Sequence, residues 1–362
     1  MNSQPGTRHS ELHPPKPRRR RAGTALGLST VVACALESAL AGRGISADVA
    51  LELARSAPLD ELFFAAGRVR EAHFGNKLHC CSILSVKTGR CSENCGFCAQ
   101  SGHHRTDVQA TDLLDDDAVR RATREARTNR ASAMGLVSSG CGPAGAHFED
   151  YCARLESVRD EGLSVHASLG LIDAAHARRL AALGVTVYNH NLESARSFFG
   201  EICTTHGYDD RLATLEALKE AGISRCCGGI FGLGESWEQR VELAAELARL
   251  GIERVPINFL HPIPGTPFEN RPLLPAREAL RIVAVFRLML PKALIQVCGG
   301  RELVLGHLQP LAFAAGATGV ILGNYLTTKG RPAAEDLAMF AELGLELATE
   351  TTTTESAADE RR

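Results

Sequence analysis

Three cysteines, Cys91, Cys95 and Cys98, lie close together in the sequence, with three and then two residues between them. Thiolates are soft ligands that hold zinc or iron–sulfur clusters. A structural zinc site needs four ligands, but no fourth cysteine follows at zinc-finger spacing, and His103 and His104 are close but poorly placed. Three thiolates suit a [4Fe-4S] cluster in which one iron lacks a protein ligand and is free to bind a substrate.

The same cysteine spacing also occurs on one face of a buried helix, where cysteine acts as a small apolar residue. Ser92, Asn94 and Gly96 argue against this alternative, because all three are unfavourable inside a helix. The segment also follows a short apolar run, Leu78–Ser85, that predicts a strand. We therefore expect a loop, in which glycine and short side chains let the backbone wrap closely around a cluster.

From Leu78 onward, short apolar runs alternate with amphipathic stretches, a pattern typical of alternating strands and helices. The predicted strands are Leu78–Ser85, Ala131–Val137, Leu163–Leu169, Val185–Asn189, Arg225–Phe231, Arg254–Leu260, Leu294–Cys298 and Gly319–Leu322. The predicted helices are 115–128, 148–160, 174–182, 208–221, 237–250, 276–289, 302–314 and 333–343. Eight such units predict an α/β fold, a (β/α)8 barrel of the TIM type over residues 77–345, with reacting groups at the carboxyl ends of the strands.

A doubly wound open sheet is the alternative fold. It would need a glycine-rich dinucleotide-binding turn after the first strand. The segment at that position is Lys87–Cys91, which contains a single glycine. The barrel is therefore the favoured architecture.

The two ends of the chain show less of this pattern. Residues 1–21 contain several prolines and a run of four arginines, and we expect a disordered basic arm. Residues 22–76 are predicted to form N-terminal helices, although the stretch 22–35, with Cys34 near its end, loosely resembles an export or lipoprotein signal. Residues 346–362 are predicted to be a polar tail.

Composition and charge exclude several classes of function. Hydrophobic residues make up 44% of the chain and charged residues 23%, which is ordinary for a soluble protein and excludes wholesale disorder or a membrane bundle. No apolar stretch reaches the roughly 18 residues of a membrane-spanning helix. Forty basic and forty-two acidic side chains nearly balance, so nothing general attracts the chain to nucleic acid or to acidic lipid.

A Cys-x3-Cys-x2-Cys loop after the first strand of a barrel resembles the radical S-adenosylmethionine (SAM) superfamily. The resemblance implies that Cys91, Cys95 and Cys98 bind the catalytic [4Fe-4S] cluster, and that its open iron chelates the amino and carboxylate groups of SAM. It also implies that one electron from the cluster cleaves SAM, and that the resulting 5′-deoxyadenosyl radical abstracts hydrogen from an unactivated C–H bond. Such a radical needs an enclosed site, which a closed barrel supplies.

Motifs at three further strand ends resemble the biotin synthase family within that superfamily. The motifs are Tyr188-Asn189-His190-Asn191-Leu192-Glu193, Gly228–Glu235 and Val255-Pro256-Ile257-Asn258. The similarity runs from about Leu51 to Leu345. It implies the last step of biotin biosynthesis, in which sulfur is inserted into dethiobiotin.

The resemblance also implies roles for individual residues. Asn189, Asn191 and Asn258 would contact dethiobiotin, whose cyclic urea offers an acceptor carbonyl between two N–H donors. Asn191, Glu193 and Arg211 would contact SAM. Glu193 stands where the family often has an aspartate on the ribose hydroxyls, and Arg211 would meet the SAM carboxylate. The alternative for each one alone is a loop polar residue with satisfied hydrogen bonds.

The sulfur source departs from the family pattern. In the best-known branch of the family the donor is a second cluster, [2Fe-2S], held by three cysteines and an arginine. By local alignment only Cys226 is retained here, because Ala133 and His166 replace the other two cysteines and Gln296 replaces the arginine. A conventional two-iron site is therefore not expected.

Other cysteines lie near these positions. Successive residues of a strand alternate between faces, so Cys298 points the same way as Gln296, which is inward if the family's arginine position is. The remaining expectations are that Cys81 and Cys226 point inward and that Cys80 and Cys227 point outward.

We hypothesise an auxiliary iron–sulfur cluster of undetermined type, bound by Cys81, Cys226 and Cys298. Its fourth ligand would be Cys227 or a residue other than cysteine. The alternative is that these cysteines only fill the apolar core.

The resemblance further implies a flavodoxin- or ferredoxin-type electron donor, and because such donors and SAM are cytosolic we predict a cytoplasmic enzyme. A homodimer stays open as the oligomeric state. Two other functions also stay open. One is a related radical SAM maturase or mutase that donates no sulfur, against which the three asparagines argue. The other is a non-catalytic zinc or iron–sulfur binding module, which would not cleave SAM reductively.

Overall fold

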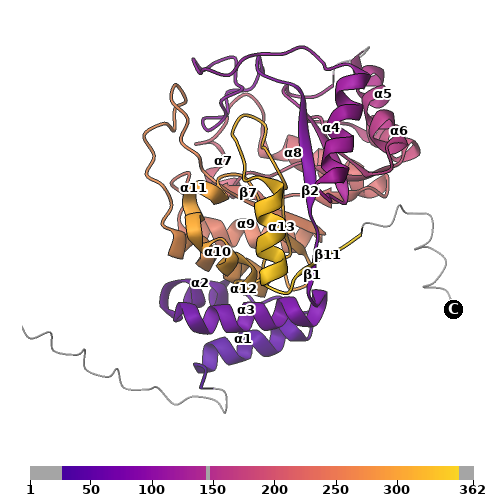
Figure 1. Cartoon of the computed structure of the whole chain (residues 1–362). Coiled ribbons are helices and arrows are strands. Elements are labelled where there is room, and N and C mark those ends of the chain that lie inside the picture. Colours follow the sequence, from indigo (N-terminus) through magenta and orange to yellow (C-terminus); the bar gives the residue numbers. More distant parts are fainter. Residues whose placement is uncertain (1–26, 144–146, 350–362) are drawn as a thin grey trace, which may run out of the picture.

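The computed structural model describes residues 27–143 and 147–349. A barrel of strands surrounded by helices forms the main body, and three N-terminal helices lie together at one end of it (Figure 1). The predicted basic arm 1–21, the start of the predicted helical segment (22–26) and most of the predicted tail (350–362) lie outside the described residues.

The three N-terminal helices are α1 (Thr30–Leu40), α2 (Ala47–Ser56) and α3 (Leu59–Phe74). Ser46 caps α2, because its hydroxyl accepts a hydrogen bond from the N–H of Val49 at 3.4 Å. The apolar faces of these helices pack against one another and against α10 (Ala276–Met289) of the barrel. They lie at the end of the barrel from which its first strand starts, away from the cysteine loop (Figure 1).

The barrel sheet consists of parallel strands in the order β2, β3, β4, β5, β6, β8, β9 and β10, with β7 paired to β8. Their bounds are β2 (Cys81–Lys87), β3 (Ala133–Ser138), β4 (Ser164–Ser168), β5 (Val185–Asn189), β6 (Ser224–Cys226), β7 (Gly229–Phe231), β8 (Arg254–Phe259), β9 (Leu294–Val297) and β10 (Gly319–Val320). A parallel bridge between Cys81 and Ile321 joins the two ends, and the N–H of Leu322 donates to the carbonyl of Cys81 at 2.9 Å. The sheet therefore closes on itself, which confirms the predicted TIM-type barrel.

The helices around the barrel begin and end close to the predicted residues. They are α4 (Asp116–Thr128), α5 (His147–Asp160), α6 (Ala174–Leu183), α8 (Tyr208–Glu220), α9 (Trp237–Leu250), α10 and α13 (Ala333–Glu342). The short helix α7 (Arg196–Phe199) was not predicted. Local signals fix these ends: the Asp115 carboxylate caps α4, Ser236 and Gln239 form a capping box on α9, and Gly184 and Gly251 end α6 and α9 with φ of 94° and 64°. Within the described residues, no helix has the length and hydropathy needed to cross a membrane.

Two predicted elements are broken in the structure. The predicted strand 225–231 is divided into β6 and β7 around Gly228, where the backbone runs so close to β8 that a Cβ would lie 2.0 Å from the carbonyl of Pro256. The predicted helix 302–314 is divided into α11 (Arg301–Leu305), a short 3-10 turn η1 (Gly306–Leu308) and α12 (Pro310–Ala314). Gly306 has φ of 50°, and Pro310 has no N–H to continue a helix.

The predicted start of the polar tail at residue 346 is wrong. Glu346 and Leu347 form strand β11 (Glu346–Leu347), which pairs in parallel with β1 (Lys77–Leu78) just before the barrel begins. The side chains of Lys77 and Glu346 also form an ion pair. Both strands are too short to produce a recognisable periodic pattern in the sequence.

The apolar core lies between the outer face of the barrel and the helices. Phe231 of β7 and Phe286 of α10 meet edge to face, with ring centroids 5.2 Å apart. Beside them Arg287 is completely buried, and its guanidinium donates to four backbone carbonyls, those of Leu290, Pro291, Ala293 and Gly316. This arginine ties α10 to the loops around it.

Candidate active site

One cavity of about 440 Å³ opens inside the barrel. Its walls contain all of the site residues predicted from the sequence: Cys81, Cys91, Cys95, Cys98, Asn189, Asn191, Glu193, Arg211, Cys226, Asn258 and Cys298. These residues come from β2, β5, β6, β8, the end of β9 and the adjoining loops, so the closure of the barrel is what brings them together.

The cysteine segment is a loop and not a helix. It folds back on itself because the N–H of Cys91 donates to the carbonyl of Gln100 at 3.0 Å, and the N–H of Gly102 donates to the carbonyl of Cys91 at 2.7 Å. The Nε2 atoms of His103 and His104 lie 2.9 and 3.0 Å from the carbonyls of Ser92 and Cys95. Both histidines therefore hold the loop through its backbone.

The loop thiols, Cys91, Cys95 and Cys98, fit a cluster better than a single ion. Four tetrahedral zinc bonds of about 2.3 Å would bring the sulfur atoms within about 4 Å of one another. In the described residues, the group of His, Cys, Asp or Glu ligand atoms that lie within 4.8 Å of one another consists of Glu93, Cys203 and His206, not of the loop thiols. The three loop thiols therefore do not all lie within 4.8 Å of one another, as ligands of a single zinc ion would.

The electrostatic surroundings of Cys98 also suit a cluster. Burial raises the pKa of Cys98 to about 11, while backbone N–H groups of Gln100 and Ser101 donate to its sulfur and work in the opposite direction. A lone thiolate is therefore unfavourable at this position, and iron would supply the positive charge that stabilises it. N–H donors on the sulfur are also how proteins tune an iron–sulfur cluster.

The polar residues predicted to bind SAM and substrate form a hydrogen-bonded row. Asn189 Nδ2 donates to Asn191 Oδ1 at 3.1 Å, and Asn191 Nδ2 donates to Glu193 Oε2 at 3.4 Å. Arg211 Nη1 donates to the carbonyl of Asn191 at 2.6 Å and lies 3.8 Å from Glu193 Oε1. Burial raises the pKa of Glu193, against the opposing effects of Arg211 and of the Asn191 hydrogen bond.

Asn258 lies on β8, apart from this row. Its Oδ1 accepts a hydrogen bond from the N–H of Gly299 at 3.0 Å, and its Nδ2 donates to the carbonyl of Gly229 at 3.3 Å. The amide is therefore held by the backbones of two neighbouring segments, with its side chain in the cavity wall.

The glycine pair Gly228–Gly229 permits a close approach between the row and the next strand. Glu193 has φ of 66°, and its carbonyl accepts a hydrogen bond from the N–H of Ile230 at 2.8 Å. A Cβ on Gly229 would lie 2.5 Å from that carbonyl oxygen. Only glycine fits here, so the pair is needed for the position of the Glu193 backbone.

The barrel thiols, Cys81, Cys226 and Cys298, all line the cavity. Cys80 and Cys227 are also buried but belong to the apolar core and not to the cavity wall, so the predicted alternation of faces is confirmed. Burial raises the pKa of Cys298 well above its usual value, and the nearby thiols of Cys81 and Cys226 add to the effect. The three barrel thiols are therefore close enough to interact.

The positions aligned with the family's other auxiliary ligands have different surroundings. His166 and Gln296 line the cavity, but Ala133 does not. Ala133 pairs in register with Cys81, whereas Gly135 lies beside His166 and faces the cavity. The part of the β3 wall that faces the cavity at this level therefore carries no side chain.

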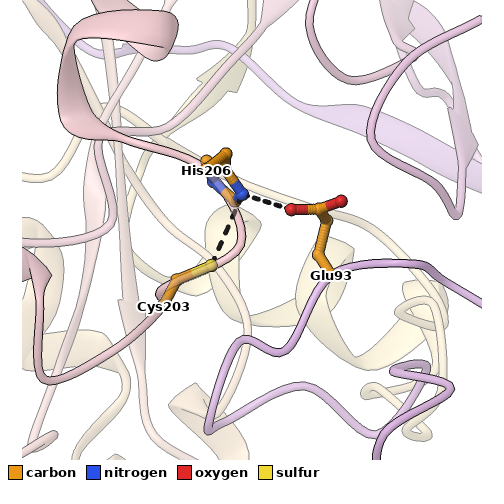
Figure 2. A group of neighbouring side chains, drawn as sticks. All are labelled: Glu93, Cys203 and His206. Atoms are coloured by element: carbon orange, nitrogen blue, oxygen red, sulfur yellow. Dashed lines mark hydrogen bonds and ion pairs between the residues drawn. The ribbon is translucent and has the colours of Figure 1, made fainter.

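The sequence interpretation gave no role to a buried polar group beside the cysteine loop, made of Glu93, Cys203 and His206 (Figure 2). Glu93 Oε2 accepts hydrogen bonds from Thr205 Oγ1 at 2.6 Å and from His206 Nδ1 at 2.5 Å. Burial opposes ionisation of Glu93, but the hydrogen bonds from Thr205, His206 and Ser92 outweigh it and lower the pKa to about 2. Glu93 is therefore a stable carboxylate. Glu93 lies more than a hundred residues before Cys203 and His206, so no local motif indicates the whole group.

His190 is a second residue without a role in the sequence interpretation. It is 6% exposed, lines the cavity, and its Nε2 has no hydrogen-bond partner among the described residues. Burial lowers the pKa of His190 well below its usual 6.5, and Arg211 and His206 add to the effect. The imidazole is therefore kept neutral, with one buried nitrogen that has no hydrogen-bond partner among the described residues.

Comparisons with known proteins find similarity in both sequence and fold. Residues 85–248 match the Radical SAM superfamily, and residues 256–346 match the Biotin and Thiamin Synthesis associated domain. The solved structures of methylornithine synthase and of a maturase of the [FeFe]-hydrogenase are similar, with TM-scores of 0.75 and 0.78 and identities of 20% and 18%. They cover 87% and 89% of this chain, which covers 97% and 76% of theirs. The closed barrel, the loop thiols and the superfamily match define a radical SAM enzyme.

Closer sequence relatives narrow this class. A biotin synthase from Trichlorobacter lovleyi is 47% identical over 317 residues, which are 86% of this chain and 95% of the relative. A biotin synthase from Pelotomaculum thermopropionicum is 49% identical over 288 residues, or 79% and 90% of the two chains. The chain belongs to the biotin synthase family.

Proposed function

We propose that this enzyme converts dethiobiotin into biotin by radical sulfur insertion, with SAM as the source of the radical. The observation that carries the proposal is one cavity inside the barrel whose walls contain the loop thiols, a row of amide and carboxylate groups, and a second set of thiols. Family membership supports the same reaction. Dethiobiotin gains one sulfur at two carbons that carried only hydrogen, so the reaction needs two hydrogen abstractions and a sulfur donor.

The loop thiols would hold the [4Fe-4S] cluster, with Glu193 and Arg211 beside it for SAM. When bound, the cluster and SAM supply a carbon radical that removes hydrogen atoms from the substrate. Arg211 is only 9% exposed and lines the cavity, where its guanidinium would bind the SAM carboxylate through charge-assisted hydrogen bonds. The Glu193 carboxyl, next to Asn191, would bind the ribose hydroxyls.

The three asparagines would bind the ureido ring of dethiobiotin. An amide offers both a donor and an acceptor, and a cyclic urea requires both. Asn258 is held by two backbone groups and Asn189 by Asn191 and by Cys226, so the amides are already oriented before a substrate enters. This orientation would lower the entropic cost of binding and keep the substrate carbons near the radical.

The barrel thiols would hold the auxiliary iron–sulfur cluster, which is the sulfur donor in this proposal. His166, which faces the same cavity, is the candidate for a fourth ligand, since Cys227 belongs to the apolar core. The charge of the family's arginine is missing here, because Gln296 is neutral and its Nε2 donates to the carbonyl of His79 at 3.0 Å. The ligand set would therefore differ from three cysteines and an arginine.

Iron analysis tests the auxiliary cluster. The triple variant Cys91→Ala, Cys95→Ala, Cys98→Ala, reconstituted without oxygen, should retain iron and sulfide above background. Adding Cys298→Ala should remove that remainder. A triple variant without iron would contradict the auxiliary site.

The reaction is tested by incubating the reconstituted enzyme with dethiobiotin, SAM and a strong reductant without oxygen. We expect biotin together with about two 5′-deoxyadenosine for each biotin, one for each abstraction. A radical SAM maturase or mutase without a sulfur donor would form 5′-deoxyadenosine and no biotin. A metal-binding module without catalysis would form neither.

An electron donor of the flavodoxin or ferredoxin type would reduce the cluster, which supports a cytoplasmic location for the reaction. A homodimer is the proposed oligomeric state, and sedimentation of the reconstituted enzyme tests it. The proposals on the electron donor and on the oligomeric state do not depend on the chemistry of the cavity.

A further inference from the structure

We propose that His206 is a positioning residue that orients the guanidinium of Arg211 toward the SAM carboxylate, and that Glu93 of the cysteine loop holds His206 in the form this requires. We call these three residues the relay. The proposal rests on the proposed function, because it concerns how the same cavity binds SAM. It connects the loop that would hold the cluster with the residue that would hold the carboxylate.

His206 lies between the charged side chains of Glu93 and Arg211, and these two contacts allow only one tautomer of its ring. Its Nδ1 is 2.5 Å from Glu93 Oε2, and its Nε2 is 3.1 Å from Arg211 Nε (Figure 2 shows the Glu93 side). The Nε of an arginine always carries a hydrogen and only donates. Nε2 of His206 must therefore be the acceptor, so the ring carries its proton on Nδ1 and donates it to Glu93. The neutral Nδ1–H tautomer satisfies both neighbours.

The relay is held in place at each end. Ser92 and Thr205 donate hydrogen bonds to the Glu93 carboxylate. The His206 side chain is only 7% exposed and meets the ring of Phe199 edge to face at 5.7 Å. The Arg211 guanidinium lies 5.5 Å above the centre of the same phenyl ring. Neither the imidazole nor the guanidinium can turn freely.

The relay also determines which hydrogens of Arg211 face the cavity. The Nε hydrogen is used by His206, and one Nη1 hydrogen is used by the carbonyl of Asn191 at 2.6 Å. Among the described residues, no hydrogen bond involves Nη2. Because two edges of the planar group are held, the remaining edge has a fixed direction, and a carboxylate arriving there meets oriented donors.

A bound metal ion is the alternative interpretation of Glu93, Cys203 and His206, whose ligand atoms lie within 4.8 Å of one another. A metal on Nδ1 would displace the proton that His206 donates to Glu93. The ring would then carry its proton on Nε2, directed at the Nε hydrogen of Arg211. Two donors would face each other in a buried site, which is costly. The relay is therefore the better interpretation.

Two substitutions of His206 distinguish the effect of its hydrogen bonds from the effect of its side-chain volume. His206→Leu removes both hydrogen bonds at similar volume, whereas His206→Gln can donate to Glu93 through its amide nitrogen and accept from Arg211 through its amide oxygen. If His206→Leu does not fold, His206→Asn replaces it, because that side chain is polar but too short to reach both partners. His307→Leu, at an exposed histidine on η1 far from the cavity, is the matched control.

The measurement is the affinity for SAM per [4Fe-4S] cluster in reconstituted protein, by equilibrium dialysis, with iron and zinc counted in the same samples. We expect His206→Leu to weaken SAM binding about 10- to 100-fold, as substitutions behind a binding group commonly do. His206→Gln should stay within about threefold of the native protein. In an Arg211→Ala background, His206→Leu should add less than about twofold, because it acts through Arg211.

Three results would overturn the relay. One is SAM affinity within about twofold of native in His206→Leu. Another is an undiminished effect of His206→Leu in the Arg211→Ala background. The third is a zinc or iron ion beyond the clusters that disappears from the His206 variants.

The native enzyme serves as the reference for the proposed function itself. If it forms biotin while the His206 variants bind SAM normally, the relay alone is wrong. If the native enzyme forms no biotin, the proposed function is wrong whatever the SAM affinities are.

Discussion

The loop thiols and the barrel thiols share one cavity but differ in how the chain presents them. Cys91, Cys95 and Cys98 belong to one loop of eight residues, whose backbone and histidine contacts fix its shape. Cys81, Cys226 and Cys298 come from three strands or strand ends far apart in the sequence, and closure of the barrel brings them together. A local motif therefore carries one of the two proposed cluster sites, and the fold as a whole assembles the other.

The difference has a chemical counterpart. Backbone N–H groups donate to the sulfur of Cys98, and the Glu93 carboxylate of the same loop belongs to a hydrogen-bonded network. Around Cys298, burial and two further thiols dominate, and its pKa rises well above the usual value. A site with tuned sulfur ligands suits repeated electron transfer. A site among buried thiols, without the usual arginine, suits a cluster that is altered during the reaction.

The largest effect is expected when one of the loop thiols is removed. Cys95→Ala removes one of the three proposed ligands of the SAM-binding cluster, so both 5′-deoxyadenosine and biotin formation should fall about 10³-fold or more. Chromatography of the products after anaerobic incubation measures both. The outermost cysteine, Cys34 on α1, is exposed, and Cys34→Ala should leave both rates unchanged. Reductive cleavage of SAM by Cys95→Ala at a near-native rate would contradict the assignment.

The second prediction concerns the removal of one of the barrel thiols, which should affect the two products differently. Cys298→Ala should leave reductive cleavage of SAM within a few-fold of native, because the loop thiols are untouched. Biotin formation should fall about 100-fold or more, because the sulfur donor is lost. The ratio of 5′-deoxyadenosine to biotin is the diagnostic quantity. An equal fall of both products would mean that the two sites are not separate.

The third prediction concerns the backbone that positions Glu193 beside the loop thiols. Gly229→Ala would place a Cβ 2.5 Å from the Glu193 carbonyl oxygen, so it should lower the free energy of unfolding by about 2–3 kcal/mol. Gly200→Ala is the control, since its Cβ would meet nothing within 4 Å, and it should change stability by less than about 0.5 kcal/mol. Denaturant unfolding of the two variants compares them. Equal stability would contradict the close approach.

The smallest expected effect concerns the binding of dethiobiotin by Asn258. Asn258→Ala should raise the KM for dethiobiotin about tenfold, as expected for one lost hydrogen bond in a buried site. The KM for SAM should stay within about twofold, because Asn258 lies apart from the row of Asn189, Asn191 and Glu193. Steady-state kinetics with each substrate varied in turn distinguish the two effects. A change confined to SAM would reverse the proposed roles.

The sequence predicted the barrel well because its signals are local. The alternation of apolar runs, the capping residues Asp115 and Ser236, and glycines after helices are each visible within a few residues. Strand parity was enough to separate Cys80 and Cys227 from their cavity-facing neighbours. By contrast, the break at Gly228 depends on how closely β8 approaches, which the sequence does not contain.

The same distinction explains what the sequence did not predict about the site. His206 and Glu93 are more than a hundred residues apart and meet only after the loop that follows α7 packs on the cysteine loop. Neither belongs to a spacing that would mark a ligand. The pairing of Glu346–Leu347 with Lys77–Leu78 was missed for a similar reason, since two-residue strands have no period of their own.

In the proposed reaction, the sulfur that enters the product comes from the auxiliary cluster bound by the barrel thiols. The most direct measurement is a single turnover of enzyme reconstituted with sulfide of mass 34, followed by mass spectrometry of the biotin formed. We expect biotin that is two mass units heavier from the native enzyme, and none from Cys298→Ala. Unlabelled biotin, or labelled biotin in equal yield from the Cys298→Ala variant, would contradict it.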